Sequence, residues 1–146
     1  MRREKGFSLL EIMIAVFVLA IGLLGVAGLQ LVSMKSGQSA FLRSQATLLA
    51  YTIVDDIRAN RPNVADYAIA LGGTNSATGL AGQDLTAWLG DLASELPTGR
   101  GSVVVSGNRV TVCVEWDERI AKPAGYVNRC DANDTTKSSA RIETDV

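Results

Sequence analysis

The residue types that most enzymes use for chemistry are scarce in this chain. Its 146 residues include no histidine, which removes Ser-His-Asp and Cys-His nucleophiles and histidine-ligated metal sites. An acidic cluster of Glu115, Asp117 and Glu118 has no evident base or nucleophile beside it. The formal net charge of -1 gives no basic surface for nucleic acid. We therefore expect no catalytic residue, no enzymatic activity and no nucleic-acid partner.

The chain contains two cysteines, Cys113 and Cys130, with 16 residues between them. They do not form a C-x-x-C unit, and no second pair completes a zinc site. If this region lies outside the cytoplasm, a disulfide is the natural interpretation, and a loop of this size is worth about 3 kcal/mol. A redox-active pair is the alternative.

Asp131, Asn133 and Asp134 are the residues that could bind calcium. An EF-hand loop needs Gly at its sixth position and Glu at its twelfth. Thr136 and Ile142 stand at those positions here. We expect no calcium site, and no metal or cofactor elsewhere.

A lone carboxylate, Glu11, stands at the start of a long apolar run. No charged residue occurs from Ile12 to Met34, and about 20 such residues span a bilayer as a helix. Arg2, Arg3 and Lys5 precede the run, so the N-terminus should stay in the cytoplasm. An ordinary secretory signal is the alternative, but the run is long for one and Glu11 would serve no purpose in it.

The segment Gly6-Phe7-Ser8-Leu9-Leu10-Glu11, followed by an apolar helix, resembles the signature of type IV prepilins. The resemblance implies that a prepilin peptidase removes residues 1–6 by cutting between Gly6 and Phe7. It also implies that the same enzyme methylates the new amine of Phe7. The mature protein would be anchored in the bacterial inner membrane by a single pass, with its head in the periplasm, before it enters a pilus.

Glu11 has a physical role in this interpretation. Cleavage would expose a charged amine on Phe7, four positions before Glu11, and such positions share one face of a helix. A carboxylate inside a membrane span is costly and usually has a partner. In a bundle of such helices, Glu11 can pair with the Phe7 amine of a neighbouring subunit. The alternative is an interfacial Glu11 that reaches water without a partner.

The helical pattern continues past the membrane segment, which we place at residues 7–34. Over residues 35–61 one apolar face recurs at helical spacing, and Pro62 should end the helix. The whole helix, from Phe7 to about Asn60, would be about 80 Å long. The face comprises Leu42, Ala46, Leu49, Ile53 and Ile57.

Residues 6–61 are similar to PilV-type minor pilins. Major pilins usually carry a proline at the position of Gly28 and often a glycine at that of Ala20. Gly22, Gly25 and Gly28 fit close helix packing or a segment that unwinds during assembly. The resemblance implies a minor pilin that helps to initiate or cap type IV pilus assembly, with a role in adhesion and twitching motility. Its partners would be other minor pilins, the major pilin and the inner-membrane assembly machinery. The alternative function is a minor pseudopilin of a type II secretion system.

Residues 62–146 should form a small head, so that the fold class is α+β with a long helix on an antiparallel sheet. Residues 72–84 have loop composition, and Leu85, Trp88, Leu89, Leu92 and Leu96 mark a short helix between an Asp84 N-cap and Pro97. Residues 101–106 and 109–115 form a predicted hairpin around Gly107-Asn108. In it, Val110, Val112, Val114 and Trp116 should face the long helix. Residues 141–146 form a predicted edge strand. The charges of the disulfide loop should be solvated, with a contact to a partner as the alternative. They are Asp117, Glu118, Arg119, Lys122 and Arg129.

Overall fold

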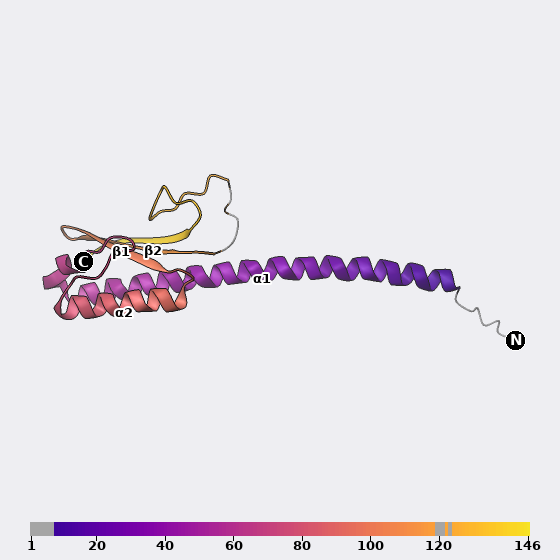
Figure 1. Cartoon of the computed structure of the whole chain (residues 1–146), viewed down its shortest axis with the longest axis horizontal. Helices are drawn as coiled ribbons and strands as arrows, with labels where there is room; N and C mark the ends of the chain where they lie inside the picture. The colour runs from indigo at the N-terminus through magenta and orange to yellow at the C-terminus, as the bar shows by residue number, and fades with distance from the viewer. Residues whose placement is uncertain (1–7, 119–121, 123) are drawn as a thin grey trace. The chain divides into compact units, whose positions relative to one another are not determined.

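The computed structural model describes residues 8–118, 122 and 124–146. Contacts divide the chain into two units, Met1–Gln38 and Ser39–Val146. The predicted α+β class is confirmed, with one long helix and a small antiparallel sheet (Figure 1). The elements are α1 (Leu9–Ala59), the 3-10 helix η1 (Arg61–Tyr67), α2 (Gly79–Glu95), β1 (Arg100–Ser106), β2 (Arg109–Trp116) and β3 (Ser138–Asp145).

Helix α1 runs without interruption for 51 residues. Gly22, Gly25 and Gly28 lie within it, and a Cβ built on any of them would meet nothing within 4 Å. The helix ends at Ala59, and Pro62 lies at the start of η1, where its missing N–H costs nothing. The sequence predicted this end closely but did not predict η1.

The core lies in the second unit and brings together α1, α2 and the sheet. All five residues of the predicted helix face, from Leu42 to Ile57, are buried. Helix α2 contributes Leu85, Trp88 and Leu92, and the indole Nε1 of Trp88 donates a hydrogen bond to the carbonyl of Leu49, 2.9 Å away. This bond satisfies a polar group that would otherwise be buried without a partner.

The three strands are antiparallel in the order β1-β2-β3. Gly107, with a φ of 61°, makes the predicted turn between β1 and β2. The alternate residues Val110, Val112, Val114 and Trp116 are all buried, and all belong to the same core as α1. Strand β3 begins at Ser138, earlier than predicted, and it pairs with β2 from Ser138 to Asp145.

Helix α2 corrects one prediction. It begins at Gly79, inside the stretch expected to be a loop, and its N-cap is Thr78 rather than Asp84. Asn75 holds the start of α2, because its amide donates to the carbonyl of Gly82 at 2.8 Å and its oxygen accepts from the backbone N–H of Ala77. Asp84 lies within the helix and accepts a hydrogen bond of 2.5 Å from the Tyr67 hydroxyl. The carboxylate therefore joins α2 to η1 instead of capping the helix.

Gly101 allows α2 and β1 to approach closely. A Cβ built on Gly101 would collide with the ring of Trp88 and with Leu92 Cδ1. Only glycine fits at this point without a shift of the helix or the strand.

Candidate functional site

The N-terminal part of α1 carries the first group of predicted site residues. The helix starts after Ser8, whose carbonyl accepts hydrogen bonds from the backbone N–H groups of Glu11 and Ile12 at 3.0 and 3.2 Å. Glu11 lies exposed in the first turn, where the positive end of the helix dipole favours a carboxylate. Gly6 and Phe7 lie outside the described residues. Cleavage, methylation and the pairing of Glu11 with an amine therefore stay predictions.

Between Leu9 and Met34, α1 exposes apolar side chains on every side. Leu9 is 77% exposed, Phe17 67% and Leu29 73%. Within the described residues, α1 is the helix that is long and apolar enough to cross a membrane, and none of its most apolar window is buried. Soluble proteins rarely expose apolar patches of this size. This surface is therefore expected to contact lipid or other apolar helices.

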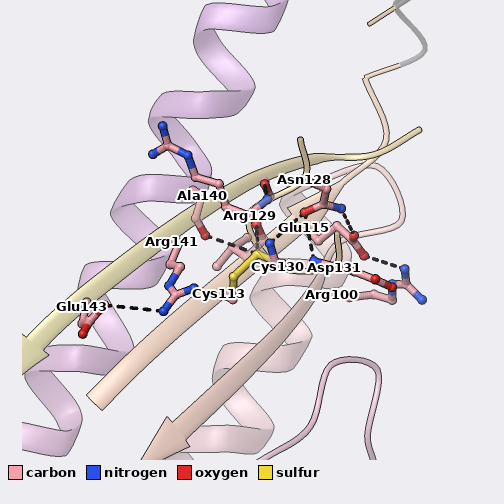
Figure 2. The surroundings of a disulfide bond; sticks show 12 residues. Arg100, Cys113, Glu115, Asn128, Arg129, Cys130, Asp131, Ala140, Arg141 and Glu143 are labelled. Atoms are coloured by element: carbon pink, nitrogen blue, oxygen red, sulfur yellow. Dashed lines mark hydrogen bonds and ion pairs between the residues drawn. A yellow bond between two sulfur atoms is a disulfide. The ribbon is translucent and has the colours of Figure 1, made fainter. Parts of the chain in front are cut away.

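The second group, Cys113 and Cys130, forms the predicted disulfide, with an S–S distance of 2.07 Å and a Cα–Cα distance of 5.6 Å (Figure 2). Cys113 is on β2 and faces away from the core residues Val112 and Val114. The bond fastens the loop before β3 to this outer face. Because of that cover, Cys113 and Glu115 are buried although they alternate with the core valines.

A buried carboxylate, which the sequence analysis did not single out as structural, supports this loop. Glu115 is fully buried, and its two oxygens accept hydrogen bonds of 2.5 Å from Arg100 and from Asn128 (Figure 2). Asn128 Oδ1 in turn accepts the backbone N–H groups of Cys130 and Asp131 at 2.9 and 3.2 Å. The sequence signal that could have revealed this ion pair was the position of Arg100 opposite Glu115 in the β1–β2 hairpin.

The prediction that the charges of the disulfide loop are solvated is wrong for two of them. The side chains of Glu118 and Lys122 are only 3% and 11% exposed and form an ion pair of 3.0 Å. Arg43 on α1 lies 3.4 Å from Glu118. Burial would raise the pKa of Glu118, but hydrogen bonds from Lys122 and Ser138 and the charges of Lys122 and Arg43 lower it overall. Arg119 lies outside the described residues.

The Asp131–Asp134 segment uses its carboxylates to form turns. Asp131 accepts the backbone N–H of Asn133, and Asp134 accepts that of Thr136, both at 2.9 Å. These short-range bonds are typical of Asx-turns. No group of three or more metal-binding side chains occurs among the described residues.

One comparison with known proteins identifies the N-terminal region. Residues 1–27 match the family model described as the prokaryotic N-terminal methylation motif. Searches of curated proteins and of solved structures returned no significant match. The motif is typical of type IV prepilin-like proteins, and a long N-terminal helix with a small antiparallel sheet fits the pilin fold. The N-terminal region thus carries a motif typical of type IV pilin-like and pseudopilin-like proteins.

Proposed function

We propose that this protein is a minor pilin of the type IV pilus, which acts at low copy to initiate or cap the filament. The observation that carries the proposal is the methylation motif at the head of a helix that exposes apolar residues along its first half. Such a helix needs lipid before assembly and other helices afterwards. The proposed role is structural and not enzymatic, in keeping with a sequence that has no histidine to act as a general base.

Assembly, in this proposal, begins when prepilin peptidase cuts between Gly6 and Phe7 and methylates the Phe7 amine. The basic residues of the leader support a cytoplasmic N-terminus, with a single membrane pass and a periplasmic head. Glu11 then pairs with the Phe7 amine of a neighbour as the helix leaves the membrane for the filament. An unpaired carboxylate in an apolar bundle would be costly, so the pairing also sets the register between subunits.

The likeness of residues 6–61 to PilV-type minor pilins supports the pilus over a secretion system. Gly28 stands where major pilins usually have proline, and Ala20 stands where they often have glycine. A nucleus of several different subunits is costly to form and easy to extend. Loss of one member should therefore reduce the number of filaments more than their length.

Mass spectrometry of sheared pili, combined with deletion of the gene, tests the proposal. We expect the chain at low ratio to the main pilin, starting at a methylated Phe7. Deletion should strongly reduce surface pili and twitching motility, while the main pilin still accumulates in the membrane. If deletion instead blocks type II secretion and leaves pili intact, the protein is a minor pseudopilin. If this chain is the most abundant subunit, the minor assignment is wrong.

A further inference from the structure

A hollow of about 610 Å³ on the head is lined by two arginines and two serines. Arg43 comes from α1, Tyr126, Val127 and Arg129 come from the loop before β3, and Ser138 and Ser139 begin β3. All of these residues belong to the second unit. A hollow of this size can hold a small molecule rather than a single ion.

Arg129 is held in place by its backbone, while its guanidinium has no partner among the described residues. Its N–H donates to the Ser139 hydroxyl at 2.8 Å, and it lies between the buried Asn128 and the disulfide-bonded Cys130. Within the described part of the chain, no carboxylate or hydrogen-bond acceptor meets its guanidinium, and Figure 2 draws no interaction there. None of the five N–H donors of this group is used by a described residue, so they are open to a ligand.

Arg43, on α1, supplies further hydrogen-bond donors to the hollow. Its backbone is fixed because Leu42 and Ala46, on the same stretch of α1, are buried in the core. Among the described residues, its Nε alone is engaged, at 3.4 Å from Glu118, and its side chain stays 62% exposed. The two terminal nitrogens have no partner among the described residues. They form the edge of a guanidinium that binds oxyanions in a bidentate manner.

The charge balance of the hollow is positive although the chain as a whole has a formal charge of -1. Its described lining contains two guanidinium groups and no carboxylate. The nearby Glu118 does not offset them, because Lys122 already pairs with it at 3.0 Å. Ser139 accepts a hydrogen bond from Arg129 and keeps its own hydroxyl proton for a ligand.

We propose that this hollow binds a small polar molecule that carries a dianionic oxyanion, such as a phosphate monoester. Two guanidinium groups match the two charges, and the serine hydroxyl adds a donor. The remaining volume, with the Tyr126 ring and Val127 in its wall, accommodates the carrier of the oxyanion. Although Arg43 lies on α1, this site does not depend on the proposed role of the apolar residues 9–34 in assembly.

The test uses the full chain, labelled with ¹⁵N, in a nonionic detergent at constant ionic strength. Titration with glucose 6-phosphate should shift the amide signals of Arg129 and Ser139 and reach saturation, and uncharged glucose should not. Arg43→Gln and Arg129→Gln should each weaken binding by about tenfold or more, because each removes a charge-assisted pair.

Arg109→Gln is the matched control, because Arg109 already pairs with Glu143 and Asp145 at 3.3 and 3.6 Å and does not line the hollow. It removes the same charge and should leave the affinity unchanged. Equal weakening by Arg109→Gln would mean that net charge alone attracts the ligand, and it would overturn the proposal. So would a titration with glucose 6-phosphate that does not saturate in the millimolar range.

Discussion

At the scale of single residues, the two carboxylates Glu115 and Glu118 are structural, although the sequence places both in one acidic cluster. Each is buried and each has its own cation, Arg100 for Glu115 and Lys122 for Glu118. Removal of one member of such a pair leaves an unpaired buried charge. Sequence reasoning identified the cysteines but could not find these pairs, because burial of the outer sheet face depends on how the disulfide loop folds back.

The disulfide should contribute stability without being needed for the fold. Replacement of Cys113 and Cys130 by Ser should lower the free energy of unfolding by about 3 kcal/mol, since the loop is no longer closed in the unfolded chain. The head should still fold, because Glu115 and Asn128 hold the same loop. Chemical denaturation of the full chain in detergent measures the loss. Free thiols in native, unreduced protein would contradict the pairing itself.

The contribution of Asp56 to the stability of the fold should change with pH in the opposite direction from that of a paired carboxylate. Burial, followed by the charges of Asp84 and Asp55, raises its pKa above 3.8 in the folded state. Its ionised form therefore destabilises the fold above that raised pKa, and the penalty disappears as the pH falls below 3.8. Asp56→Asn should raise the melting temperature at pH 7, and the gain over wild type should shrink in acid.

Asp55→Asn is the control for this change. Asp55 is on the same turn, exposed, and paired with Arg58 at 3.2 Å. Its replacement should give a smaller gain at pH 7, because it removes only the weaker repulsion of Asp56 by Asp55, and the exposed pair with Arg58 contributes little. A gain of equal size from both variants would show that the effect comes from general charge and not from the site of Asp56.

At the scale of elements, the sequence predicted the helices and strands whose pattern is set by burial on one face. The face of α1 and the alternation of Val110 to Trp116 are examples. It missed the first turns of α2, because Gly79 and Gly82 have loop propensity and Thr78 stands at the N-cap without a side-chain capping hydrogen bond. Asn75 supports this turn instead. Asp84 was a plausible cap by residue type, but tertiary contact with Tyr67 decides its role.

The approach of α2 to β1 gives a test at this scale. Gly101→Ala should destabilise the head by about 1–3 kcal/mol, because its methyl group would collide with Trp88 and Leu92. Gly90→Ala is the matched change, on the exposed side of α2 with nothing within 4 Å. It should stabilise the helix by up to about 1 kcal/mol. Thermal unfolding of the two variants should therefore shift in opposite directions.

At the scale of the whole molecule, the two units are suited to different surroundings. Residues 39–146 bury a common core, while the apolar residues from Leu9 to Met34 are exposed. The large apolar residues of this segment are each more than half exposed. The sequence predicts that this segment lies first in a membrane and later in a bundle of helices. Such a bundle would form only when several subunits assemble.

In the proposed assembly, Glu11 links one subunit to the next, and its replacement should separate membrane insertion from subunit pairing. Glu11→Ala should leave insertion unchanged or improve it, since a charge is removed from the apolar phase. Co-purification with partner pilins should fall by about tenfold or more, because the amine of the neighbouring Phe7 loses its partner within an apolar bundle. Glu4→Ala is the control, because that carboxylate lies in the predicted leader and would be absent from the mature protein.

Membrane fractionation measures insertion, and pull-down with a tagged partner pilin measures subunit pairing. Unchanged co-purification of the Glu11→Ala protein would refute the pairing and leave Glu11 as a carboxylate that only favours the start of α1.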